Sequence, residues 1–145
     1  MYWGIDVGST YTKIAGLDEA RQLVFNNTIH TMVHQDQRVR EVLADKTVMR
    51  LVSTGYGREM LKNALGCTSV SEIQAHARGA AHFLPEVSFV LDLGGQDSKV
   101  IQIERGQFVD FRMNDKCAAG TGRFLEIAAN RLGMTLEEFG IACAE

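Results

Sequence analysis

The 145-residue sequence predicts an α/β protein built from two related units of strands and helices. Each unit begins with a short apolar strand that ends in Asp-x-Gly, once at Asp6 and again at Asp92. An alternating strand, a turn, a third strand and a helix follow in both cases. Because the pattern begins near Tyr2 and recurs near Val87, the two acidic glycine turns are expected to hold equivalent places in the two units.

Composition narrows the class of protein. With 46% hydrophobic and 23% charged residues, the chain can bury a normal core. Its 15 basic and 18 acidic residues give a net charge of −3, which implies no attraction to nucleic acid or membrane. No apolar run approaches the roughly 18 residues of a membrane span, so a cytoplasmic protein is expected. Cys67, Cys117 and Cys143 form no C-x-x-C unit, which argues against a disulfide framework or a complete metal site within one copy.

Apolar periodicity predicts the elements of the first unit. Alternation with period two indicates strands, and the i, i+3, i+4 spacing of Val39, Val42 and Leu43 indicates an amphipathic helix. The expected order is strands over residues 2–7, 11–17 and 21–31, that helix, a strand over 47–53 and a helix over 58–65. A further helix opens with a capping box at Ser71 and should stop before Pro85.

The second unit repeats the strands of the first. Strands are expected over residues 87–93, 98–103 and 107–113, with a turn at Arg105-Gly106. A helix entered at Asn114, with Cys117 in its first turn, should end at Gly133. A final helix is then capped by Thr135-x-x-Glu138.

The two acidic turns are the candidate site for a nucleotide's phosphates. Glycines let backbone N–H groups approach phosphate oxygens, and hydroxyl and ammonium side chains add donors. Asp6 and Asp92 are placed to coordinate Mg²⁺ directly or through water. The candidate nucleotide-binding residues are Gly8, Ser9, Thr10, Thr12, Lys13, Gly94, Gly95, Gln96, Asp97, Ser98 and Lys99. Hairpins whose Asp and Gly only satisfy turn geometry remain an alternative, and neither a Walker nor a Rossmann pattern is present.

These turns resemble the two phosphate loops of the actin, heat-shock-chaperone and sugar-kinase ATPase superfamily. Further segments look like the activator ATPases of 2-hydroxyacyl-CoA dehydratases and the related benzoyl-CoA reductase ATPase subunits: Ser53-Thr54-Gly55-Tyr56-Gly57-Arg58, His76-Ala77-Arg78-Gly79-Ala80, and the stretch from Asn114 to Phe124 that contains Cys117. The resemblance implies a ribonuclease-H-like mixed β-sheet flanked by helices. It also implies a first subdomain over residues 1–84 and the start of a second, incomplete one over 85–145.

The resemblance further implies an ATP-dependent activator. In that family a [4Fe-4S] cluster shared by two subunits passes a low-potential electron to a 2-hydroxyacyl-CoA dehydratase or related reductase, with reduced ferredoxin or flavodoxin as donor. Cys117 is then a cluster ligand at a homodimer interface, and a thiolate at a helix N-terminus suits that role. Asp6, Asp92 and Gln96 would position the water for ATP hydrolysis. The second ligand cysteine and the adenosine-binding part of the family lie beyond Glu145, so a fragment is expected.

Alternatives remain open for the function and for one side chain. A small-molecule kinase of the same fold would phosphorylate its product and need no iron, and a non-catalytic nucleotide-binding module would keep the loops without turnover. His76 is interpreted as a helix-surface residue, with a polar contact beside the nucleotide cleft as the alternative.

Overall fold

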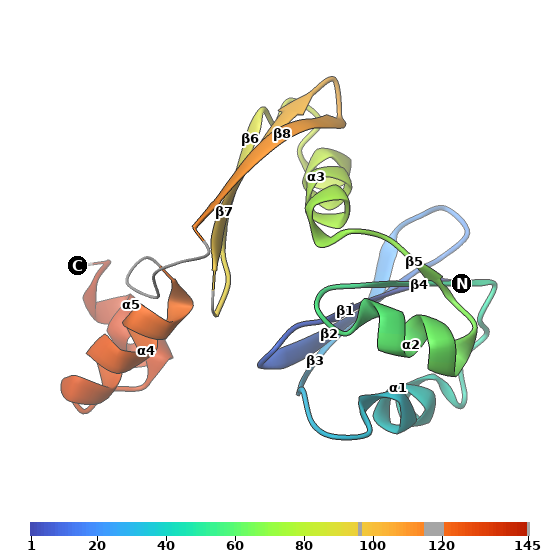
Figure 1. Cartoon of the computed structure of the whole chain (residues 1–145), viewed down its shortest axis with the longest axis horizontal. Helices are drawn as coiled ribbons and strands as arrows, with labels where there is room; N and C mark the ends of the chain where they lie inside the picture. Colours follow the sequence, from blue (N-terminus) through green and yellow to red (C-terminus); the bar gives the residue numbers. More distant parts are fainter. Residues whose placement is uncertain (96, 115–120, 145) are drawn as a thin grey trace. The chain divides into compact units, whose positions relative to one another are not determined.

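Two β-sheets, one in each half of the chain, organise the structure (Figure 1). This computed structural model describes residues 1–95, 97–114 and 121–144. The chain divides into two units, Met1–Ala75 and His76–Glu145. The expected subdomain boundary after residue 84 stays a prediction. Over the described ranges, every helix is too short or too polar to traverse a bilayer.

The first unit contains a five-stranded mixed sheet. Its strands, in spatial order, are β3 (Leu23–His30), β2 (Tyr11–Leu17), β1 (Tyr2–Val7), β4 (Arg50–Thr54) and β5 (Thr68–Ser69). The first three strands along the chain are antiparallel neighbours, whereas β4 pairs in parallel with β1 and β5 in parallel with β4. This is the mixed sheet that the family resemblance implied.

Two helices, α1 (Gln35–Leu43) and α2 (Arg58–Leu65), cover one face of this sheet (Figure 1). Their residues join alternate side chains of β1 and β2 in one buried cluster: Trp3, Ile5, Val7, Ile14, Val39 and Leu61. Because successive side chains on a strand point to opposite faces, Asp6 lies on the face away from this cluster. The apolar alternation of β1 therefore positions the carboxylate.

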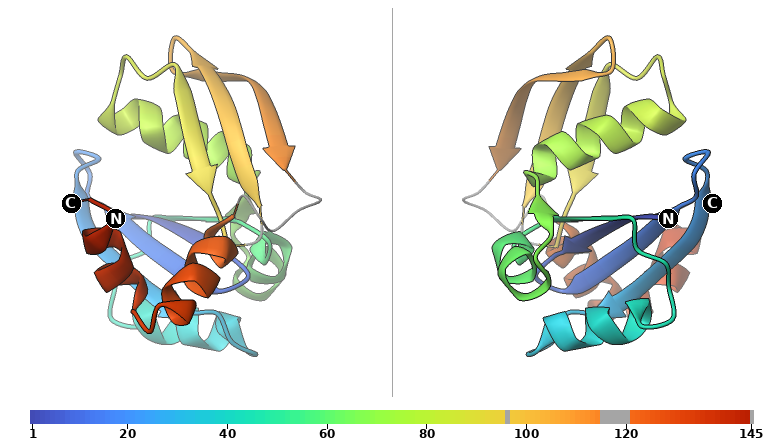
Figure 2. Two further views of the ribbon diagram at one scale, coloured as in Figure 1. Left: turned by 90° about the vertical axis from the view of Figure 1, so that its left-hand side faces the viewer. Right: turned by 90° about the vertical axis from the view of Figure 1, so that its right-hand side faces the viewer.

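The second unit contains a three-stranded antiparallel sheet. Helix α3 (Glu72–Phe83) precedes β6 (Phe89–Leu93), β7 (Ser98–Glu104) and β8 (Gln107–Asn114), which pair in that order. Residues 76–83 of α3 run along one face of the sheet (Figure 2), and Ala77 of the helix and Ile101 and Ile103 of β7 are each at most 2% exposed.

The predicted turn at Arg105-Gly106 is confirmed. The two residues have φ angles of 51° and 72°, as a two-residue hairpin loop with two left-handed residues requires. A glycine at the second position accepts this conformation without steric cost. The loop therefore joins β7 directly to β8.

The last two helices, α4 (Gly122–Arg131) and α5 (Leu136–Ala142), confirm their predicted signals. Gly133 follows α4 with a φ of 70°, and the Met134 N–H donates to the Ala129 carbonyl at 2.9 Å, which is the hydrogen bond of a glycine-terminated helix. The Thr135 hydroxyl accepts from the Glu138 N–H, and the Glu138 carboxylate accepts from the Thr135 N–H at 2.7 Å.

The expected start of the first of these helices at Asn114 is wrong. Asn114 is the last residue of β8 and pairs with Ser98, whereas α4 begins at Gly122 after the extended residue Thr121. The sheet register extends through Asn114, so strand pairing overrides the local helix-capping preference of asparagine. Cys117 lies outside the described residues, and its place in a first helical turn stays a prediction.

Candidate functional site: two acidic turns

The first acidic turn joins β1 to β2 and places Asp6 opposite Lys13 in the antiparallel register. The Lys13 ammonium lies 3.2 Å from Asp6 Oδ2. Asp6 Oδ1 is buried and receives no hydrogen bond from the described residues. A buried carboxylate oxygen without a partner is costly, and Mg²⁺ or a Mg²⁺-bound water is a chemically suitable partner for it. The geometry of Asp6 therefore fits the predicted cation.

Hydrogen bonds within the turn and from Thr31, the residue after β3, brace this turn. The Gly8 N–H donates to the Tyr11 carbonyl at 3.0 Å, and a Cβ on Gly8 would lie only 2.9 Å from that oxygen. The Thr31 hydroxyl donates to the Gly8 carbonyl at 2.9 Å. Because a hydroxyl has one proton, the Thr12 hydroxyl, 2.9 Å from that of Thr31, must be the donor between the two. Sequence reasoning missed Thr31, since only the fold brings the end of β3 to the turn.

The predicted phosphate-binding residues of the first turn fall into two groups, one buried in these hydrogen bonds and the other exposed. Thr12 is fully buried, and its proton is committed to Thr31. Ser9, Thr10 and Lys13 are exposed. The exposed residues keep donors available to a ligand, so Thr12 supports the turn whether or not it also contacts phosphate. Nucleotide binding by each of them stays a prediction.

The glycine turn before α2 lies directly against the end of β1. The Gly57 N–H donates to the Val7 carbonyl at 3.0 Å, and a Cβ on Gly57 would lie 2.5 Å from Val7 Cγ1. Gly55 has a φ of 80°, and a Cβ there would meet Asp6 Oδ1 and lie 2.7 Å from the Val7 carbonyl oxygen. The segment singled out by resemblance thus helps to enclose the Asp6 carboxylate.

The second acidic turn joins β6 to β7 and repeats the register, with Asp92 opposite Lys99. Here the lysine is only 4% exposed. Its ammonium lies 3.3 Å from Asp92 Oδ2 and 2.6 Å from Asp97 Oδ1. Lys99 therefore already balances two carboxylates of the turn, and its predicted contact with phosphate would be made from within this network.

His76 also reaches Asp92, so its interpretation as a helix-surface residue is wrong. Its Nδ1 lies 3.3 Å from Asp92 Oδ2, and the side chain is 30% exposed. The imidazole lowers the pKa of Asp92 most, Lys99 lowers it further and burial opposes both, so the pKa falls from 3.8 to about 2. Asp92 is consequently a carboxylate at neutral pH, as a Mg²⁺ ligand must be.

A main-chain hydrogen bond ties the second turn to α4. The N–H of Gly122, the first residue of α4, donates to the Gly94 carbonyl at 2.8 Å. A Cβ on Gly122 would lie 3.2 Å from the same oxygen, so the close approach favours glycine. The turn is thereby linked to the helix that follows the Cys117 segment. Gly95 is exposed, whereas Gln96, predicted to bind nucleotide and position water, lies outside the described residues, as Cys117 does.

The two described cysteines are free thiols in different surroundings. Cys67 is half-buried, with its Sγ 3.4 Å from Ser53 Oγ, and Cys143 is exposed at the end of α5. Neither is followed by Ala-Ala-Gly, as Cys117 is. Cys117 remains the candidate cluster ligand.

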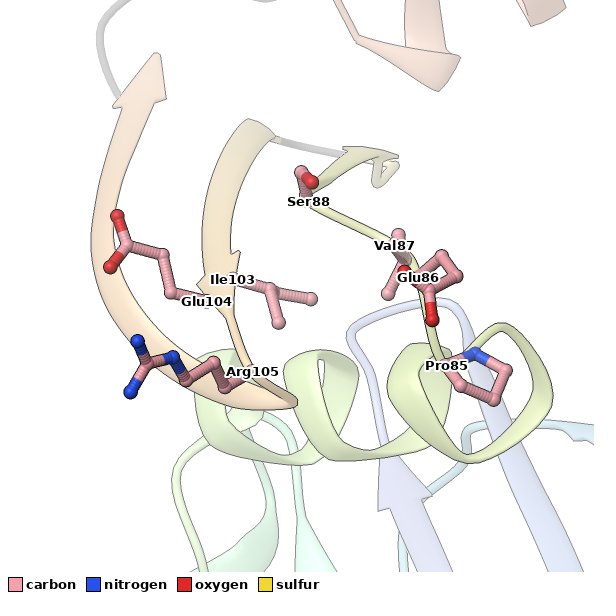
Figure 3. Close-up of a pocket in the computed structure, with 7 residues that line it drawn as sticks. All are labelled: Pro85, Glu86, Val87, Ser88, Ile103, Glu104 and Arg105. Carbon is pink, nitrogen blue, oxygen red and sulfur yellow. The ribbon is translucent and has the colours of Figure 1, made fainter.

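A surface pocket of about 500 Å³ lies at the other end of β7 from Lys99 (Figure 3). It is lined by Pro85, Glu86, Val87, Ser88, Ile103, Glu104 and Arg105. None of these is a predicted site residue. This pocket is therefore separate from the predicted site residues.

Comparison with known proteins supports the resemblance. The pattern that defines the BadF/BadG/BcrA/BcrD ATPase family matches residues 3–142. The (R)-2-hydroxyglutaryl-CoA dehydratase activating ATPase of Acidaminococcus fermentans is 38% identical over 143 residues, covering 93% of this chain and 55% of that protein. The 2-hydroxyisocaproyl-CoA dehydratase activator of Clostridioides difficile is 39% identical over 146 residues, covering 94% and 54%.

The fold agrees with a solved activator structure. The activator of the 2-hydroxyisocaproyl-CoA dehydratase from Clostridium difficile, solved with bound ADPNP, superposes with a TM-score of 0.83 at 38% identity, covering 94% of this chain and 54% of that one. The predicted actin-like ATPase fold is therefore confirmed. The chain spans about half the length of the curated relatives it matches.

Proposed function

Because the chain belongs to the BadF/BadG/BcrA/BcrD ATPase family, we propose that it provides the phosphate-binding turns and a cluster ligand of an ATP-dependent activator. The activator serves a 2-hydroxyacyl-CoA dehydratase or a related reductase in the cytoplasm. Two relatives named as dehydratase activators, both matched over more than nine-tenths of this chain, support that assignment.

In this proposal the acidic turns bind the triphosphate of ATP and its Mg²⁺. Asp6 supplies the buried Oδ1 and Asp92 a carboxylate with a pKa of about 2, so both donor groups suit a hard cation. The bound Mg²⁺ neutralises charge on the phosphates, and the backbone N–H groups of the turns contact the phosphate oxygens. Asp6, Asp92 and Gln96 orient the attacking water, and their individual roles are open to mutagenesis.

Cys117 is proposed as a ligand of a [4Fe-4S] cluster shared by two subunits of a homodimer. A bound cluster of this kind supplies one-electron chemistry at low potential, with ferredoxin or flavodoxin as the proposed donor. Thiolate ligation requires a deprotonated cysteine. One cysteine from each chain gives half of the four ligands that such a cluster takes.

The observation that carries the coupling between the two sites is the hydrogen bond from Gly122 to Gly94. It connects the second phosphate turn to α4 at 2.8 Å, with no intervening side chain. A nucleotide that displaces Gly94 would therefore displace the start of α4, and with it the segment that contains Cys117. ATP binding and hydrolysis would in this way gate electron transfer.

Anaerobic purification of the complete polypeptide tests this function. The wild type and a Cys143→Ala control should contain iron and sulfide and show cluster absorption in the visible range, whereas Cys117→Ala should lose most of it. Cys143 is a matched control because it is an exposed cysteine of the same chain. No cluster in the wild type after reconstitution, or equal iron in Cys117→Ala, would overturn the redox assignment. A phosphorylated small-molecule product would indicate the kinase alternative instead.

A further inference from the structure

We propose that His76 is a positioning residue for Asp92. With Lys99, it holds Oδ2 of the carboxylate that would bind Mg²⁺ of ATP or a water that the ion carries. The inference rests on the proposed ATP-binding function of the second turn. It adds a residue from α3, outside both acidic turns, to the machinery of the site.

The contacts of Asp92 divide its two oxygens. His76 Nδ1 and Lys99 Nζ each lie 3.3 Å from Oδ2. Oδ1 accepts no hydrogen bond from the described residues. The Asp92 side chain is 22% exposed and that of Lys99 is 5% exposed, so the pair is largely shielded while the carboxylate keeps access to a ligand. One oxygen is committed to the protein and the other is available.

The order of elements explains why His76 reaches this carboxylate. Helix α3 runs to Phe83, and the chain then turns back through strand β6 of the sheet that the helix covers. From His76 to Phe83 a helix rises about 10 Å, and from Phe89 to Asp92 a strand rises about 10 Å. Because the two segments run in opposite directions over similar lengths, the first residue of the helical segment, His76, and the last residue of the strand segment, Asp92, lie side by side.

Holding Oδ2 from two directions has a chemical purpose. A carboxylate fixed by one cation can rotate about its terminal torsion, which is broad for aspartate. Two contacts, with an imidazole from the helix and an ammonium from β7, restrict that rotation. Outer groups that orient a metal ligand typically change metal affinity by about 10–100-fold when removed. His76 is therefore expected to affect the Mg²⁺ dependence of nucleotide binding.

The test compares two substitutions in the complete polypeptide. His76→Leu removes the donor, whereas His76→Asn places an amide N–H near the position of Nδ1. Calorimetry gives the affinity for ADPNP with Mg²⁺ and with EDTA, and the ratio of the two affinities reports the contribution of the ion. We expect the ratio to fall about tenfold or more in His76→Leu and to stay within about threefold of wild type in His76→Asn. Affinity in EDTA should change little in either.

His82→Leu is the matched control, because His82 is an exposed histidine of the same helix that contacts Phe83 rather than the turn. Its Mg²⁺ ratio should equal that of wild type, and circular dichroism should show all four proteins folded. An unchanged ratio in His76→Leu, or equal losses in the Leu and Asn variants, would overturn the positioning role alone. A wild type with no Mg²⁺-dependent ADPNP binding would overturn the proposed function and this inference together.

Discussion

The two acidic turns join strands that pair in the same way, with an aspartate opposite a lysine, but the two lysines lie in different surroundings. In each turn an aspartate at the end of one strand faces a lysine on the next, Asp6 with Lys13 and Asp92 with Lys99. The Lys13 side chain is 56% exposed and contacts one carboxylate. The Lys99 side chain is 5% exposed and contacts two. The same sequence pattern therefore gives one ion pair in water and one largely withdrawn from it.

The difference separates two tasks that one motif can perform. An exposed ion pair contributes about 0–1 kcal/mol, so the Lys13 ammonium can leave Asp6 for a phosphate at little cost. A shielded lysine between two carboxylates is held more firmly, because each unpaired charge would then lack water. The first turn is thus suited to respond to the ligand, and the second to hold a preformed carboxylate.

Removal of the lysines should give the largest contrast between the turns. Lys99→Met leaves Asp92 and Asp97 without their shared cation, and we expect a loss of about 3 kcal/mol in the free energy of unfolding at neutral pH. Lys13→Met should lose less than about 1 kcal/mol. Urea denaturation followed by circular dichroism measures both. Equal losses in the free energy of unfolding for the two variants would show that the different exposure of Lys13 and Lys99 does not affect stability.

Lowering the pH should also destabilise the protein through Asp92 of the second turn, by less than the Lys99→Met substitution does. The folded-state pKa of Asp92 is lowered from 3.8 to about 2, so its stabilising contribution is complete above pH 4 and is lost as the pH falls toward 2. That shift corresponds to roughly 2 kcal/mol, allowing for partial exposure of the side chain. Carbon-13 NMR of the aspartate carboxyls, with denaturation at several pH values, measures the pKa and the loss.

Substitution at His76 is the control for the acid response. His76→Leu removes the group that contributes most to the shift, so the pKa of Asp92 should rise toward 3.8 and the acid-dependent loss should shrink. The His82→Leu variant should titrate like wild type. A wild-type Asp92 that titrates at its ordinary pKa would contradict the contacts described for this carboxylate.

Much of this comparison was predictable from local sequence. The Asp-x-Gly ends of β1 and β6 identified both turns, and the strand periodicity predicted that the next strand pairs back as a hairpin. The register that sets each aspartate opposite its lysine is a finding of the structure. Cap residues such as Gly133 and Thr135 acted as expected, because the hydrogen bonds of a helix terminus are made within a few residues. Those features depend on neighbours in sequence.

The parts that were missed depend on neighbours in space. His76 resembles a surface helix residue in sequence, and its contact with Asp92 appears only once α3 is laid along the second sheet. Thr31 reaches the first turn because β3 is the third strand of a meander. The start of α4 was wrong because Asn114 has a strand partner, Ser98, which no local preference reveals. Packing and pairing over longer separations decided all three.

The last test addresses the difference in how the equivalent glycine carbonyls are held. Gly8 accepts a side-chain hydroxyl from Thr31, whereas Gly94 accepts the first N–H of α4. Gly122→Pro removes that N–H. Proline is favoured at the first position of a helix, and the preceding Thr121, at φ −119° and ψ 170°, has the conformation that a residue before proline prefers.

In Gly122→Pro, the ring Cδ of proline would take the place of that hydrogen, against the Gly94 carbonyl oxygen that lies 2.8 Å from the nitrogen, so the turn and α4 must separate. We expect the free energy of unfolding to fall by about 1–3 kcal/mol, because the hydrogen bond is lost and the carbonyl loses its partner. The substitution should mainly weaken the coupling between nucleotide binding at the second turn and α4. In hydrogen–deuterium exchange with and without Mg²⁺–ADPNP, the amides of α4 should respond to nucleotide in wild type and in the N–H-retaining control Gly122→Ala, and respond far less in Gly122→Pro. Nucleotide affinity should be retained in all three. A response of α4 in Gly122→Pro equal to wild type would show that coupling bypasses Gly94, and the second turn would then differ from the first only in its charges.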